Sequence, residues 1–173
     1  MNKNACLVVV NAVLLVALAL GQNSSSSTGR VVQDSGFTLE NAQAELKEKT
    51  AVAVKIPTLL PGTAGQQIFA VILGFGPSDY NILLATKVPC EGGNACSYGS
   101  VQARKSPFDL EGKPVFVTLR NGISAQFFPS HCHAFCSQAY ITWKEADVFY
   151  CIGVKAARKG ELIRSANSAI LNH

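Results

Sequence analysis

The spacing of apolar residues changes along the chain, from helical before residue 50 to strand-like after it. Leu39, Ala42 and Leu46 fall on one face of a helix, with mostly polar residues between them. Thr38 precedes them and carries a hydroxyl of the kind that commonly caps a helix N-terminus. This pattern predicts a short amphipathic helix over residues 38–49.

A second helix is predicted over residues 160–172, at the other end of the chain. Its apolar residues again share one face: Leu162, Ile163, Ala166, Ala169 and Ile170. Short helices gain most of their stability by burying such a face against a neighbour. Both helices are therefore expected to pack on the structure formed by the residues between them.

The residues between the helices alternate in polarity or form short apolar runs, which predicts about eight strands. The predicted strands are 51–56, 67–75, 80–87, 97–104, 115–120, 123–128, 138–143 and 148–154. Asn121-Gly122 between two alternating runs is typical of a type I′ hairpin turn, which needs positive φ at both central residues. Short reversals such as this one join antiparallel neighbours. The expected fold is α+β: a twisted, mostly antiparallel sheet with short N- and C-terminal helices packed on it.

The last two predicted strands carry three aromatic residues, Trp143, Phe149 and Tyr150. In a hairpin these residues would lie across from one another, and such pairs stabilise neighbouring strands. We expect a cross-strand aromatic cluster that belongs to the core.

The N-terminal region predicts export. Lys3 precedes an apolar run over residues 5–20, and Ala19-Leu20-Gly21 ends it with small residues, which is typical of a signal peptide over residues 1–21. An uncleaved membrane anchor is the alternative, because the run is just long enough to approach a bilayer span. A Ser-rich linker follows over residues 22–36 and a single domain over residues 37–173. We expect a secreted or periplasmic protein that meets a membrane only through its export signal.

The distribution of charge along the chain indicates which classes of partner to expect. The formal net charge is +4, and the basic residues are dispersed along the chain. Nucleic-acid binding normally requires a concentrated basic face, so no nucleic-acid partner is expected. The sequence leaves the partner unknown, and an envelope protein or another surface partner is compatible with export. Glu145 and Asp147, in a predicted turn over residues 144–147, are expected to be solvated charges.

The cysteines indicate disulfides. The signal would remove Cys6, and the remaining cysteines tend to pair in an oxidising compartment. Several pairings are open, but closeness in sequence favours two short loops. These are Cys90–Cys96 and Cys132–Cys136, and the choice leaves Cys151 as the odd thiol.

Reactive residue types gather between His131 and Cys136. His131 and His133 would project to the same side of an extended segment, so with a thiolate such as Cys151 they could bind copper or zinc. The competing interpretation, which we favour, is a disulfide-closed loop carrying two exposed histidines. Cys151 as a nucleophile with a histidine base is weaker, because its surroundings match no known nucleophile motif. Whether the chain is an enzyme stays open, with a non-catalytic role preferred and no cofactor required.

Several C-terminal features resemble uncharacterised bacterial exported α+β domains that have a final strand hairpin followed by an Ala-Asn-Ser-Ala-Ile helix. The residues that carry the resemblance are Gly122, Phe127, Phe128, Cys132, Cys136, Ile141-Thr142-Trp143, Tyr150-Cys151-Ile152, Lys155, Leu162-Ile163 and Ala166-Asn167-Ser168-Ala169-Ile170. The segments Ile56 to Pro61 and Cys90 to Cys96 are also similar, so the resemblance covers most of the exported domain. The resemblance implies a small exported domain and no particular substrate. The function expected from the sequence is therefore a binding or structural role in the cell envelope, with the ligand unknown. The alternative is metal binding through His131, His133 and a cysteine.

Overall fold

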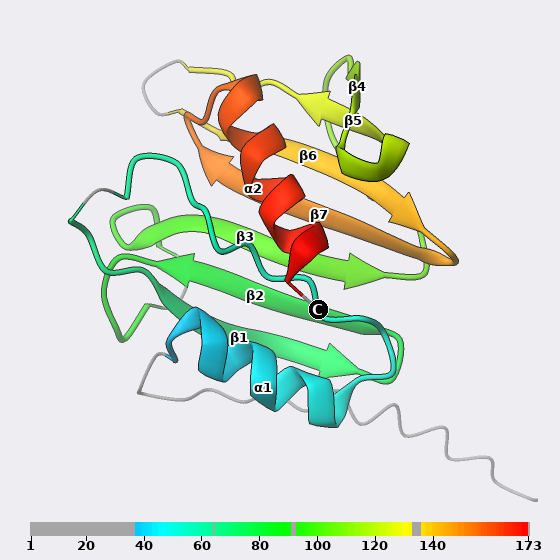
Figure 1. The fold of residues 1–173 in the computed structure, drawn as a ribbon. Coiled ribbons are helices and arrows are strands. Elements are labelled where there is room, and N and C mark those ends of the chain that lie inside the picture. Colours follow the sequence, from blue (N-terminus) through cyan, green and yellow to red (C-terminus); the bar gives the residue numbers. More distant parts are fainter. Residues whose placement is uncertain (1–36, 64, 91–92, 133–135, 173) are drawn as a thin grey trace, which may run out of the picture.

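The computed structural model describes residues 37–63, 65–90, 93–132 and 136–172. The predicted signal peptide over 1–21, the linker over 22–36 and His133 lie outside these residues. Within them, one helix precedes seven strands and a second helix follows (Figure 1). No helix in the described ranges is long and apolar enough to cross a membrane.

The seven strands form one sheet in the order β1-β2-β3-β7-β6-β5-β4, and every neighbouring pair is antiparallel. The strands are β1 (Phe69–Gly76), β2 (Asp79–Ala85), β3 (Ser97–Arg104), β4 (Val115–Thr118), β5 (Ser124–Phe128), β6 (Gln138–Glu145) and β7 (Val148–Lys155). The sheet thus joins two meanders, β1 to β3 and β4 to β7, where β3 lies beside β7. This confirms the α+β class and the antiparallel sheet.

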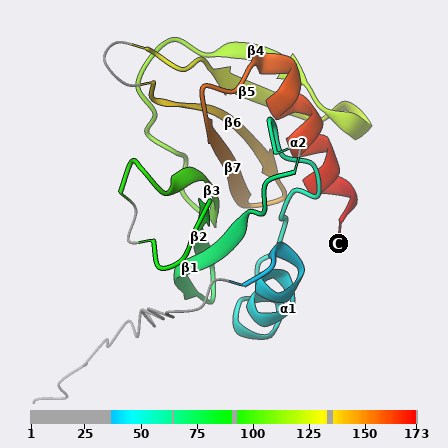
Figure 2. The same ribbon diagram turned by 90° about the vertical axis from the view of Figure 1, so that its left-hand side faces the viewer.

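Two helices cover one face of the sheet, α1 (Leu39–Lys49) over β1 and α2 (Lys159–Leu171) over β6 and β7 (Figures 1 and 2). The predicted N-cap is confirmed, because the Thr38 hydroxyl accepts the Asn41 N–H at 3.2 Å. At the start of α2, the Glu161 carboxylate accepts the Arg158 N–H at 2.8 Å. At the N-terminus of each helix, a nearby side chain therefore accepts a hydrogen bond from a backbone N–H.

The predicted Asn-Gly turn is also present. Asn121 has φ 60° and Gly122 has φ 73°, and the Ile123 N–H donates to the Arg120 carbonyl. A short 3₁₀ turn, η1 (Arg120–Gly122), spans these residues between β4 and β5. The positive φ values explain why asparagine and glycine occupy this hairpin, since other residues adopt that conformation at a cost.

The first predicted strand, over residues 51–56, is wrong. Val52, Val54 and Ile56 are buried as the pattern predicts, but Lys55 between them is buried too, and the segment crosses the helix-covered face of the sheet without pairing with any described strand (Figure 1). Distant side chains satisfy two of its backbone groups instead. The Tyr80 hydroxyl accepts the Lys55 N–H at 2.9 Å, and the Asn172 amide donates to the Ile56 carbonyl at 3.3 Å. An alternating pattern indicates that the side chains on one side of a segment are buried. It does not require that the segment pairs with another strand.

The core lies between the sheet and the covering layer. Its largest fully buried members include Tyr80, Leu46, Ile56, Ile82, Leu84, Ile141, Ile152 and Leu162. They come from both helices, both meanders and the 51–56 segment. Burial of such side chains contributes about 1.5–3 kcal/mol each. This shared core fixes the two meanders relative to each other.

Residues 105–114 cross the other face of the sheet, away from the helices (Figure 2). β3 ends at Arg104, opposite Phe149 of β7, whereas β4 begins at Val115, opposite Phe127 of β5, in the outermost strand pair of the sheet. The Arg104 guanidinium starts the crossing by donating to the Ser106 and Pro107 carbonyls, at 3.1 and 2.6 Å. This connection carries the chain from the centre of the sheet to its far edge.

Candidate functional site

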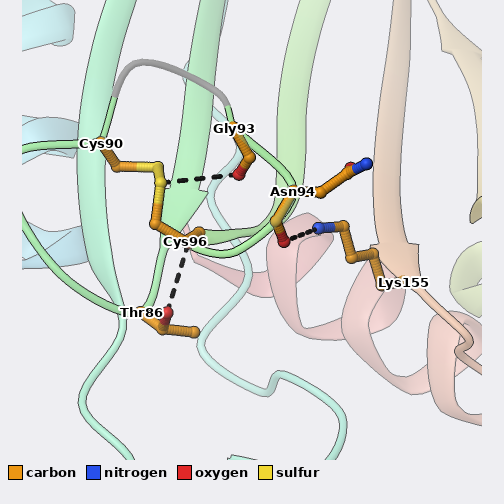
Figure 3. Close-up of a disulfide and its surroundings, with 6 residues drawn as sticks. All are labelled: Thr86, Cys90, Gly93, Asn94, Cys96 and Lys155. Atoms are coloured by element: carbon orange, nitrogen blue, oxygen red, sulfur yellow. Dashed lines mark hydrogen bonds between the residues drawn. A yellow bond between two sulfur atoms is a disulfide. The ribbon is translucent and has the colours of Figure 1, made fainter. Parts of the chain in front are cut away.

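The Cys90–Cys96 disulfide is present and belongs to the hydrophobic interior. Both cysteines are buried, and they form a second, smaller core cluster on the face away from the helices with Val71, Leu83 and Ala85. Hydrogen bonds join the loop to its neighbours (Figure 3). The Thr86 N–H and hydroxyl both donate to the Cys96 carbonyl, at 2.9 and 3.3 Å, and the Lys155 ammonium donates to the Asn94 carbonyl at 2.6 Å.

The Cys132–Cys136 disulfide is present as well, but it lies on an exposed loop between β5 and β6. Two hydrogen bonds close the base of this loop. The His131 N–H donates to the Ser137 hydroxyl at 2.9 Å, and the Ser137 N–H donates to the His131 carbonyl at 2.9 Å. The His131 imidazole is exposed beside Gly112. The favoured prediction of a disulfide-closed loop is therefore confirmed for the part that the structure describes.

Cys151 lies in the middle of β7, paired with Gln102 of β3 and Thr142 of β6. It is a free thiol and only 2% exposed. Burial raises the pKa of this thiol to about 12, although the nearby Arg104 charge lowers it in part. A thiol of this kind is protonated at neutral pH and is a poor nucleophile or metal ligand.

The described residues include no group of three or more His, Cys, Asp or Glu side chains that could hold a metal ion. His133, one of the predicted ligands, lies outside those residues. Of the other two predicted copper or zinc ligands, His131 lies on an exposed loop and Cys151 lies inside the sheet. Metal binding through His131, His133 and Cys151 stays a prediction.

A different constellation surrounds Lys55, whose side chain is only 3% exposed. Its ammonium lies 3.2 Å from a Glu145 carboxylate oxygen and 5.7 Å from the centre of the Tyr150 ring. The other Glu145 oxygen accepts the Trp143 indole N–H at 2.8 Å. Removing a lysine charge from water is costly unless it is paired and hydrogen-bonded, and this cluster meets that condition.

Aromatic rings complete the surroundings of Lys55. Trp143 and Tyr150 stack with ring centres 5.3 Å apart, which confirms the predicted cross-strand aromatic cluster for these two residues of β6 and β7. Burial raises the pKa of the Tyr150 hydroxyl to about 12, and the Glu145 and Asp147 charges add to the rise. Burial also raises the pKa of Tyr80, whose hydroxyl contacts the Lys55 backbone. The tyrosines are therefore neutral at physiological pH.

Lys55 and Glu145 line a cleft of about 640 Å³ at one end of the sheet. Its walls come from the 51–55 segment, the turn between β1 and β2 and the turn between β6 and β7. The prediction that Glu145 is a solvated charge is wrong, because this side chain is held between Lys55 and Trp143. Asp147 is exposed as predicted, although it forms an ion pair with Lys105 at 2.9 Å.

A neighbouring cavity of about 650 Å³ lies along β2 and β3. It shares Ser78 and Lys105 with the cleft, so the two hollows adjoin at the same end of the sheet. Asn81 and Gln102, which are paired across β2 and β3, contribute to its lining. We call the two hollows together the sheet-end groove.

Asn81 differs from the other residues of the sheet-end groove. Its side-chain oxygen is buried and has no hydrogen-bond partner, the only such side-chain atom among the described residues that are not exposed. The register between β1 and β2 shifts between Ile72 and Gly74, next to Asn81. An unsatisfied buried acceptor costs roughly 1–3 kcal/mol, so its presence calls for an explanation.

The sequence contains only weak signals of this groove. Lys55 lies in an alternating run between Val54 and Ile56, where a lysine is expected on a solvated side. The run Val54-Lys55-Ile56-Pro57 is apolar apart from the lysine, however, and all four residues are buried. Asn81 in an apolar strand is a second signal. Neither signal shows which residues lie next to these side chains, because that depends on the fold.

Searches for related proteins returned nothing: no family model, curated protein or solved structure matches this chain. The resemblance to exported bacterial domains is thus untested and stays a prediction.

Proposed function

We propose that this chain is an exported, non-catalytic domain that binds a polar ligand in the sheet-end groove. Two disulfides support export, because such bonds form and persist in oxidising compartments. The high pKa of the buried Cys151 thiol favours a non-catalytic role over a cysteine nucleophile. An envelope location agrees with the predicted signal peptide.

The observation that carries the binding role is the unpartnered Asn81 oxygen. It belongs to a side chain that lines a cavity of about 650 Å³ together with other polar side chains, among them Gln102, Ser78 and Ser106. The terminal torsion of asparagine is soft, so a small rotation would turn this oxygen towards the cavity. A ligand hydroxyl or amide N–H would then supply the missing donor.

The ionic surroundings of the groove favour a ligand that is polar and not strongly charged. Lys55 is paired with Glu145, and Lys105 with Asp147, so the charges along the groove largely balance. Lys105 and Asp147 are exposed, and an exposed pair contributes only about 0–1 kcal/mol. A ligand that spans both hollows could displace this pair at little cost.

Export is tested by expressing the full chain and separating its compartments. We expect the mature protein outside the cytoplasm, without Cys6, and with one thiol that reacts after unfolding in the absence of reductant. Intact-mass spectrometry after alkylation gives the count. A cytoplasmic protein with all its cysteines reduced would contradict the proposal.

The binding role predicts that Asn81→Leu stabilises the ligand-free protein. The change removes an unsatisfied acceptor, so the free energy of unfolding should rise by roughly 1 kcal/mol. Chemical denaturation of the purified protein measures it. Gln126→Leu is the matched control, since Gln126 is a partly buried amide on β5 without an unsatisfied buried atom. Destabilisation by Asn81→Leu would instead indicate a structural role for this residue.

Native mass spectrometry tests binding even though the ligand is unidentified. Protein purified gently from its own compartment should carry a small molecule as added mass. Asn81→Leu should lose that mass, and Gln126→Leu should keep it. Equal retention by both variants would place the ligand elsewhere and overturn the proposed site.

A further inference from the structure

The two outer edges of the sheet differ in their backbone hydrogen bonding. At the β1 edge, Phe37 exchanges two backbone hydrogen bonds with Ala70, at 3.0 and 2.8 Å. At the opposite edge, β4 pairs only with β5 within the described ranges, and no described backbone segment bonds to its outer side. An unpaired edge presents N–H and C=O groups that can accept another strand.

The side chains of β4 make this edge unusually apolar for an exposed strand. Phe116 is 71% exposed and Val115 is 43% exposed, two of the five large exposed hydrophobic residues in the described part of the chain. Successive side chains of a strand point to opposite faces, so apolar surface lies on both sides of this edge. β4 itself contains no proline and no charged residue, the usual means of blocking a free edge.

Positive charge flanks this apolar strand. Lys113 precedes β4 and Arg120 follows it, both side chains are exposed, and neither takes part in the ion pairs found among the described residues. A second copy paired antiparallel about the centre of β4 would set Lys113 against Arg120 at both ends. Like charges placed opposite each other destabilise a strand pair, so charge favours a different partner.

We propose that the outer edge of β4 docks an extended segment of a partner protein whose apolar centre is flanked by acidic residues. The partner segment adds a strand beside β4, and its backbone pairs with the free N–H and C=O groups. Its apolar side chains cover Val115 and Phe116, while its acidic ends lie near Lys113 and Arg120. This surface is separate from the sheet-end groove and does not depend on a ligand there.

The test uses a short synthetic peptide with alternating valine and threonine at its centre and two glutamates at each end. Fluorescence anisotropy of the labelled peptide measures binding to the full exported domain. Phe116→Lys should weaken binding at least about tenfold, because it places a charge on the docking edge. Leu73→Lys is the matched control at the other edge, where Leu73 is 40% exposed, and it should bind normally.

A charge reversal makes the test specific. Lys113→Glu combined with Arg120→Glu should reverse the preference, so that a peptide with lysines at its ends binds better than the glutamate peptide. Both side chains are exposed, and circular dichroism confirms that each variant is folded. Asn81→Leu should leave peptide binding unchanged, which separates this surface from the proposed ligand groove.

Three results would overturn the inference. The first is failure of the glutamate peptide to bind the unchanged domain at millimolar concentration, and the second is equal binding to Phe116→Lys. The third is concentration-dependent dimerisation in sedimentation experiments that Phe116→Lys abolishes, which would assign the β4 edge to a second copy of the chain. Binding that is lost in Phe116→Lys, kept in Leu73→Lys and reversed by the charge swap supports the inference.

Discussion

The two disulfide loops join cysteines at similar separations, 6 residues for Cys90–Cys96 and 4 for Cys132–Cys136. Loop closure alone would stabilise the fold by about 2 kcal/mol in either case. Their surroundings differ far more. Cys90 and Cys96 are 6% and 8% exposed and pack on apolar strand residues, whereas Cys132 and Cys136 are exposed. The comparison shows that packing, and not ring size, separates a disulfide that builds core from one that closes a loop.

The largest expected effect comes from removing the buried disulfide. Cys90→Ala combined with Cys96→Ala should lower the free energy of unfolding by about 4 kcal/mol, about half from loop closure and the rest from lost packing. Urea denaturation followed by circular dichroism measures the change. A loss of about 2 kcal/mol or less would mean that the small core cluster contributes nothing beyond the ring.

A smaller effect is expected at the exposed loop. Cys132→Ala combined with Cys136→Ala should cost about 2 kcal/mol or less, since only loop closure is lost. The same denaturation experiment applies, with the buried pair as reference. If both double variants lose equal stability, the distinction drawn from burial is wrong.

The smallest effect concerns the hydrogen bond that joins the Cys90–Cys96 loop to β7. Lys155→Met should cost about 1 kcal/mol, because the Asn94 carbonyl loses its 2.6 Å ammonium donor. Lys159→Met, at an exposed lysine that begins α2, is the control and should be near neutral. A Lys155→Met variant as stable as this control would show that the loop is held by its packing alone.

Much of the fold was predictable because local chemistry determines it. Thr38, Asn121-Gly122 and the spacing of the cysteines each act over a few residues, and the corresponding cap, turn and disulfides are present. The first predicted strand failed because its alternating pattern indicates only the buried side. Whether a partner strand or distant side chains satisfy its backbone depends on the whole topology.

The candidate site was harder to predict for the same reason. His131 and Cys151 attract attention because their side chains are reactive types, yet one lies on an exposed loop and the other inside the sheet. Lys55 and Glu145 come from distant segments and meet only at the end of the sheet, and Asn81 lines the hollow that adjoins theirs. Residue type and spacing carry no information about such contacts between residues that are distant in the sequence.

The segment after α1 has a consequence for the order of folding. The backbone N–H groups of Thr58 and Leu59 donate to the Ser168 hydroxyl, 110 and 109 residues away, and the Ile56 carbonyl accepts from Asn172, 116 residues away. During synthesis these polar groups therefore find their partners only after α2 has been made. Closing such distant contacts is slow, so the amides of Thr58 and Leu59 should acquire protection from hydrogen exchange only when α2 docks, later than the Lys55 amide, which donates to Tyr80 of β2.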